Sequence, residues 1–171
     1  GVVGELLQVP KGLEVAVETA LGASLQNIVC RDDSCAKEAI GLLKESQAGR
    51  LTFLTLGSIR TGRPSLPEKM KSAKGFLGVA ADRVTCRNGG EKVLDYLLGR
   101  VILCQDLDSA SEISRSYGGT FRFVTLQGDI INPAGAITGG SLRSNTGTER
   151  IAVLRKYLRG KGLQRLLVGT R

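Results

Sequence analysis

Short apolar runs alternate along the chain with segments whose apolar residues recur at helical spacing. Residues 5–9, 25–30 and 51–56 are such runs, and each is predicted to be a strand. The segments between them, 12–21 and 36–43, carry an apolar stripe typical of a helix against a core. This β-α-β-α-β order predicts an α/β fold, with strands flanked by helices.

The same alternation continues after a linker, residues 57–75, which is rich in glycine, proline and basic residues. Strands are expected at 76–80, 101–104 and 121–126, and helices over 93–98 and from Asp106 or Asp108 to Tyr117. We therefore predict two small α/β subdomains, residues 1–80 and 81–141, followed by a basic tail over 142–171.

The stretch from Gly128 to Ser141 is the most specific in the sequence. It predicts a hairpin of residues 129–131 and 136–138, joined by an Asn-Pro-Ala-Gly turn. It lacks the lysine of a phosphate-binding loop and the spacing of a dinucleotide fingerprint. Because glycine lets another backbone approach closely, the glycines at its end favour an interface with a second copy of the chain.

The net charge of +8 is concentrated in two places. Residues 142–171 hold eight basic residues and one acidic residue, and residues 50–74 hold six and one. Such clusters predict DNA binding without sequence preference, the alternative being a solvated surface. The basic residues of the second cluster are Arg50, Arg60, Arg63, Lys69, Lys71 and Lys74.

Residue types that support catalysis or metal binding are scarce. The chain has no histidine, and its four cysteines lack the spacing of paired ligands, so buried reduced thiols in an intracellular protein are expected. An enzyme using Asp129 or Asp106 is the weaker alternative, because Asp129 suits a turn. We expect no cofactor and no catalytic residues. No apolar run reaches the length of a membrane span.

Several motifs occur together in a characteristic order. They are GEL at 4–6, AVETALG at 16–22 with LQNIV at 25–29, GRLTFLTL at 49–56, and GD at 128–129 followed by Pro133, Gly135 and TGGS at 138–141. In this order the chain resembles the hinge domain of structural maintenance of chromosomes (SMC) proteins, in the bacterial, homodimeric branch. Relatives often carry glycine where Ala23 and Ala134 stand here.

The resemblance implies a two-subdomain hinge that joins two coiled-coil arms and pairs with a second hinge into a ring-like dimer. It places Gly135, Ala136, Thr138, Gly139 and Gly140 at the dimer contact. It also implies an ATPase, with its ATP-binding site, in a distant head domain absent from this chain. The whole protein would act in chromosome condensation and segregation, in the cytoplasm at the nucleoid.

The resemblance further implies accessory DNA binding near the coiled-coil junction, which Arg143 matches by position, whereas Arg50 stands in the family's Gly-Arg strand entry. Ile151, Leu154 and Leu158 fit the start of a coiled coil, which Gly160 and Gly162 interrupt, so the end of the tail leads toward a coiled coil or is a non-native extension. The alternative function is a stand-alone α/β domain that binds DNA or a small molecule.

Overall fold

The structure is a computed structural model, and it describes residues 1–140, 155, 156 and 158–162. The strands, in chain order, are β1 (Leu7–Gln8), β2 (Ile28–Cys30), β3 (Phe53–Thr55), β4 (Phe76–Val79), β5 (Thr85–Cys86), β6 (Val101–Cys104), β7 (Arg122–Thr125), β8 (Ile130–Ile131) and β9 (Ile137–Thr138). The helices are α1 (Val3–Leu6), α2 (Glu14–Leu21), α3 (Asp33–Glu45), α4 (Glu68–Lys71), α5 (Ala80–Arg83), α6 (Glu91–Leu98) and α7 (Leu107–Tyr117), and a 3₁₀ turn spans Gly22–Gln26.

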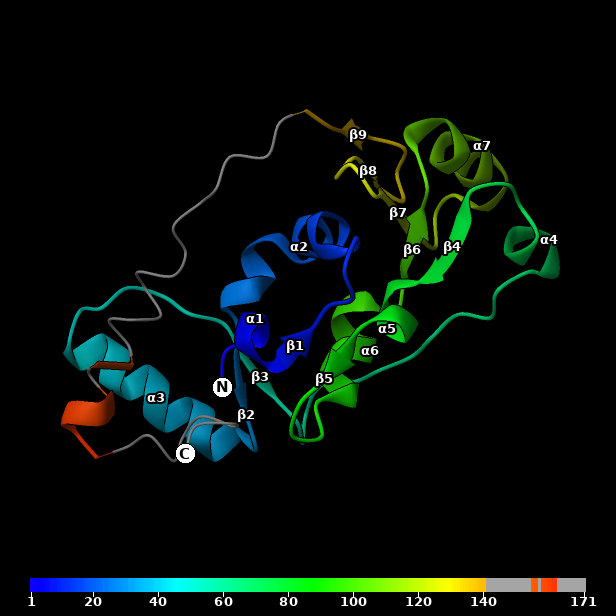
Figure 1. The fold of residues 1–171 in the computed structure, drawn as a ribbon. Helices are drawn as coiled ribbons and strands as arrows, with labels where there is room; N and C mark the ends of the chain where they lie inside the picture. The colour runs from blue at the N-terminus through cyan, green and yellow to red at the C-terminus, as the bar shows by residue number, and fades with distance from the viewer. Residues whose placement is uncertain (141–154, 157, 163–171) are drawn as a thin grey trace.

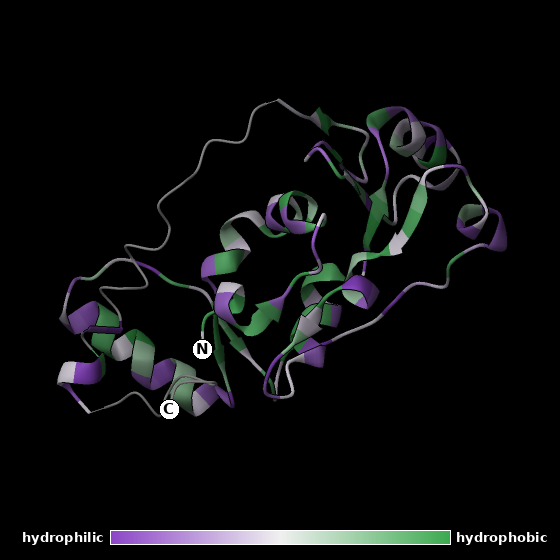
Figure 2. Ribbon diagram, in the orientation of Figure 1, coloured by the Kyte–Doolittle hydropathy of each residue, from purple (hydrophilic) through white to green (hydrophobic). Residues whose placement is uncertain are grey.

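The largest sheet has five strands in the order β4-β6-β7-β8-β9 (Figure 1). Only the β6–β7 pair in this sheet is parallel. All four residues of β6 are buried, and the strand is uniformly hydrophobic in Figure 2, so helices must cover both of its faces. Helix α2 lies on one side of this sheet and α7 on the other (Figure 1).

A smaller sheet pairs β2 and β3 in parallel, with α3 as the crossover between them. Asp32 begins α3, because its side chain accepts a hydrogen bond of 2.9 Å from the amide of Cys35. Asp106 caps α7 in the same way through the amide of Ser109, at 2.8 Å. The predicted mixed α/β class is confirmed.

The first expected strand, 5–9, is wrong over most of its length. Val3–Leu6 forms a helical turn, and only Leu7 and Gln8 pair with another strand. Val3 and Leu6 are both buried, three residues apart, which places them on one side of a helical turn facing the core. The buried residues of this segment therefore follow helical spacing, although the sequence suggested a strand.

The two halves of the chain pack into one another. Helix α2 contributes Ala16, Val17, Ala20 and Leu21 to the core of the five-stranded sheet, and β4 pairs with β6 of that sheet. A further buried cluster joins Val3, Leu6, Val29 and Leu54 to Val93 of α6. The subdomain boundary at residue 80 stays a prediction.

The described residues near the C-terminus dock on the first half of the chain. Residues 155, 156 and 158–160 lie beside α3 (Figure 1), and Leu158 is fully buried against Val2, Ile28 and α3. Arg155 forms an ion pair with Glu5 of α1. Ile151, Leu154 and most of the predicted basic tail lie outside the described residues.

Candidate functional site

The hairpin of β8 and β9 matches the one predicted from the glycine-rich stretch. Asn132 donates a hydrogen bond of 2.9 Å to the carbonyl of Ala136, and Gly135 donates one of 2.8 Å to the carbonyl of Asn132. Pro133, Ala134 and Gly135 form a three-residue loop, in which the last residue has φ of +94°. Glycine is favoured there because few side chains adopt positive φ.

Strand β9 is an edge strand with an open side. Its register pairs Ile131 with Ile137 and Ile130 with Thr138. Because Asn132 and Ala136 form a hydrogen-bonded pair, the antiparallel alternation makes the next pair, Ile131 and Ile137, non-hydrogen-bonded. The N–H and C=O of Ile137 therefore point away from β8, and no residue that the structure describes pairs with them.

The opposite edge of the sheet is protected. Strand β4 shifts register between Phe76 and Gly78, an irregularity of the kind that disrupts pairing with another strand. Arg83 also donates to the carbonyl of Leu77 through Nε at 2.9 Å and through its NH2 group at 2.6 Å. Of the two edges of this sheet, β9 is thus the one that the described residues leave open to a further strand.

The five residues assigned to the dimer contact all lie on this exposed hairpin. The chain's own geometry explains its glycines: Gly135 and Gly140 have φ of +94° and +124°, with open space where a Cβ would be. At Gly139 a Cβ would instead collide with Asp129 Oδ1 of the same chain. The glycines therefore do not by themselves identify a partner.

Ile137 is the residue of this edge that sequence reasoning missed. It is 58% exposed, among the most exposed of the large hydrophobic residues described. The predicted hairpin already placed this isoleucine on its short last strand. An exposed isoleucine there has no core of its own chain to pack against, which is a sign of an interaction site. Its side chain and its outward main chain make it the centre of the open edge.

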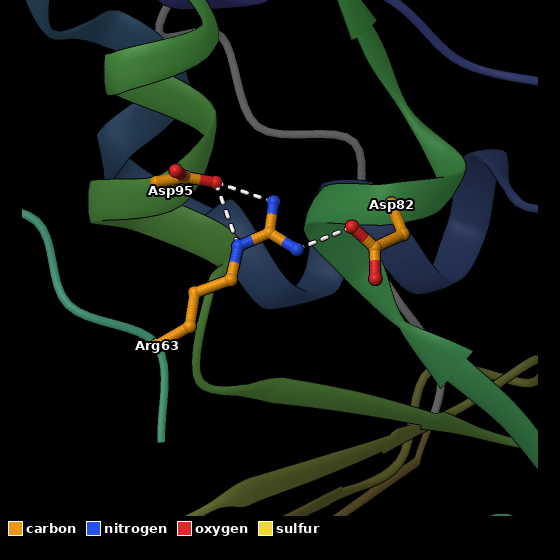
Figure 3. Close-up of polar contacts among 3 residues, drawn as sticks. All are labelled: Arg63, Asp82 and Asp95. Carbon is orange, nitrogen blue, oxygen red and sulfur yellow. Dashed lines mark hydrogen bonds and ion pairs between the residues drawn. The ribbon is translucent and has the colours of Figure 1, made fainter. Parts of the chain in front are cut away.

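Arg63, predicted to contact DNA, is held by two carboxylates. Its guanidinium bonds Asp82 at the end of α5 and Asp95 of α6, the latter through Nε at 2.8 Å (Figure 3). The hydrogen bonds that Arg63 donates to Asp82, and secondly to Asp95, raise its pKa. The side chain thus fastens the linker to the α5–α6 corner.

The other basic residues of the cluster over 50–74 do not form one patch. Arg50 follows α3, whereas Lys69 and Lys71 belong to α4, at the opposite end of the molecule (Figure 1). Lys71 pairs with Glu68 at 2.7 Å. Arg50, Arg60, Lys69 and Lys74 are exposed, and Arg143 lies outside the described residues.

Cys30 and Cys104 are buried free thiols, as the sequence suggested. Burial raises the pKa of Cys30 to about 11 and that of Cys104 to about 12.

In the described part of the chain no three acidic, histidine or cysteine side chains gather as metal ligands would. None of the helices described there has the length and apolar character to span a bilayer.

Asp129 is engaged in the turn between β7 and β8. Its amide donates to Thr125 Oγ1 at 3.0 Å, and its carboxylate accepts from the same hydroxyl at 3.2 Å. A surface hollow of about 420 Å³ is lined instead by Lys11, Asp82 and Arg83 together with apolar residues. Asp129 thus has the role of a turn residue and does not line that hollow.

Comparison with known proteins gives a consistent result. Residues 1–114 match the family model for the SMC proteins flexible hinge domain. The chain is 45% identical over 146 residues to the chromosome partition protein Smc of Halothermothrix orenii and 40% identical over 145 residues to that of Bacillus subtilis. These alignments cover 85% and 84% of the chain but only 12% of either relative.

Solved structures agree with the sequence relatives. An asymmetric dimer of the Geobacillus stearothermophilus SMC hinge domain matches with a TM-score of 0.76 and 35% identity, covering 97% of this chain and 70% of that one. The Pyrococcus furiosus SMC hinge domain matches with a TM-score of 0.68 and 31% identity, over 85% and 77% of the two chains. The sequence, the mixed α/β fold and these matches show that the chain belongs to the family of SMC flexible hinge domains.

Proposed function

We propose that this chain is a dimerisation module whose open β9 edge pairs with a second copy. The observation that carries the proposal is the outward main chain and exposed side chain of Ile137, on an edge that no described residue pairs with. The hinge domain of Geobacillus stearothermophilus, a structural relative, is a dimer. The proposed contact consists of Gly135, Ala136, Thr138, Gly139 and Gly140, together with Ile137.

The proposed assembly is a head-to-tail ring with two equivalent contacts. Strand β9 has only two residues, so one such contact offers few hydrogen bonds. Two contacts that close a ring act together, because the second forms within an already joined pair. A short edge strand can therefore support a stable dimer.

Ile137→Pro tests the proposal. Proline removes the outward N–H of residue 137, which takes no part in the ladder with β8, so the hairpin is retained. Loss of one hydrogen bond at each of two contacts costs about 2 kcal/mol in total, which raises the dimer dissociation constant about thirtyfold. Sedimentation equilibrium measures this constant directly.

Two matched variants separate the possible causes. Ile137→Ala keeps the N–H and removes most of the side chain, so it reports the apolar share of the contact. Tyr96→Ala removes another exposed hydrophobic residue, 49% exposed on α6, and leaves the dissociation constant unchanged. A wild-type chain that stays monomeric at tens of micromolar, or an Ile137→Pro dimer as tight as wild type, would contradict the proposal.

Within a longer protein, the module would join two coiled-coil arms of a chromosome segregation ATPase in the cytoplasm at the nucleoid. The curated relatives are chromosome partition proteins of which this chain spans about 12%, and another structural relative is an SMC hinge with an extended coiled coil. These matches support the hinge over a stand-alone domain that binds DNA or a small molecule.

Non-specific DNA binding by the linker stays a prediction. Exposure of Arg60, Lys69 and Lys74 supports it, whereas Arg63 and Lys71 are already paired with carboxylates. Replacing the three exposed residues by glutamine should lower affinity for duplex DNA at low salt and flatten its salt dependence. If the affinity for duplex DNA were unchanged, the linker would not be a DNA-binding site.

A further inference from the structure

We infer that Asp129 is the reason for glycine at position 139, and that it positions the end of β9 for pairing with a second copy. The inference rests on the proposed function, because the end of β9 matters in this way only if the edge is paired.

The hairpin register brings Asp129 and Gly139 together. Ile130 is paired with Thr138, so one more step places Asp129 opposite Gly139. Alternation makes this a non-hydrogen-bonded pair like Ile131 and Ile137, the type in which facing Cα atoms are closest, at about 4.5 Å. The carboxylate of Asp129 can occupy this site because Gly139 has no side chain.

Turning the carboxylate of Asp129 aside would break its hydrogen bond with Thr125. The amide of Thr125 donates a hydrogen bond of 2.9 Å to the carbonyl of Asp129. The Thr125 hydroxyl accepts one from the amide of Asp129 and donates one to its carboxylate. Thr125 is itself fully buried. A Cβ at residue 139 would collide with Oδ1 and would lie 3.4 Å from Cγ and 3.8 Å from Cβ of Asp129. Relief therefore requires the carboxylate to leave Thr125 or the strand end to move.

Movement of the strand end would reach the open edge. The alternation that directs the N–H and C=O of Ile137 outward does the same for Gly139, two residues further on. These two residues present the main-chain groups available to another strand. Displacing Gly139 would move its N–H and C=O out of register with a pairing strand, while those of Ile137 stayed in place.

The experiment is a double-mutant cycle on the dimer dissociation constant. Gly139→Ala is expected to raise it at least about tenfold, equivalent to about 1.4 kcal/mol. In the Asp129→Ala background the same substitution should change it less than about twofold, because the obstructing carboxylate is gone. Asp129→Asn keeps the size of the side chain and should give no relief, which identifies the cause as steric.

Gly135→Ala is the matched control. It also replaces a hairpin glycine, but the penalty comes from its φ of +94°, with no atom within 4 Å of the new Cβ. Asp129→Ala should therefore not relieve it. If Gly139→Ala alone does not fold, the double variant with Asp129→Ala should recover folded protein. That recovery would show the same coupling between the two residues, measured by stability.

The outcomes separate this inference from the proposed function. If Gly139→Ala weakens the dimer equally with and without Asp129→Ala, the inference is wrong and the dimer proposal stands. If the wild-type chain does not dimerise, the proposed function fails, and the positioning role fails with it. A cycle in the melting temperature then still reports whether the two residues are in contact.

Discussion

Leu158→Ala tests whether the C-terminal turn is an integral part of the fold. Leu158 is fully buried among Val2, Ile28, Cys30, Ala39 and Leu43, the small core under α3. Truncating a buried leucine to alanine costs roughly 2–5 kcal/mol, through lost burial and the cavity left behind. A cost of about 3 kcal/mol lowers the melting temperature of a domain of this size by about 6–12 °C.

Burial, rather than helix propensity, must hold this turn of residues 158–160 in place, because Gly160 lies within it and Gly162 follows closely. Calorimetry and urea unfolding measure the loss, and trypsin cleavage at Arg159 should become faster as the turn detaches. Leu158→Met keeps the volume and should cost below about 1.5 kcal/mol. A Leu158→Ala chain with the melting temperature and cleavage rate of wild type would refute the docking of this segment.

Three further predictions concern buried thiols, a helix cap and the linker. Cys30 and Cys104 should not react with a disulfide reagent at pH 8 until the chain is unfolded, because burial raises their pKa values to about 11 and about 12. Hydrogen bonding from a main-chain amide lowers the pKa of Asp106 below 3.8, so its stabilisation is present above that pH and is lost as the pH falls through the folded-state pKa. The difference in melting temperature between wild type and Asp106→Ala should accordingly shrink on acidification. Arg63→Gln should lower the free energy of unfolding by at most about 1 kcal/mol, because the ion pairs are partly exposed.

Local signals in the sequence predicted most of the helices and strands. The start of α7 was narrowed to Asp106 or Asp108, because a capping side chain bonds an amide only three residues away. The hairpin of β8 and β9 was visible because its turn residues have conformational preferences of their own. The short helix at Val3–Leu6 was missed because burial of one helical turn outweighed the strand pattern.

Contacts distant in sequence could not be predicted in this way. The sequence marked Arg63 as a free basic residue, but Asp82 and Asp95 are 19 and 32 residues away. Leu158 docks against residues near the start of the chain, which no local periodicity encodes. The candidate edge contains one feature of each kind. Its turn could be predicted from local sequence, whereas the contact of Asp129 with Gly139 could be recognised only once the strand register was known.

The proposed ring makes a quantitative prediction for mixed dimers of wild type and Ile137→Pro. In a head-to-tail ring each β9 edge belongs to a separate contact, so the two substitutions are distant and their costs add. At about 1 kcal/mol each, the mixed dimer should be about fivefold weaker than wild type and the doubly substituted dimer about thirtyfold weaker. If the β9 edges instead paired with each other across one two-fold axis, the first proline would already block the shared strand pair and the second would add little. Mixing differently labelled chains and measuring energy transfer over a dilution series distinguishes these cases. A mixed dimer as weak as the doubly substituted one would exclude two independent contacts.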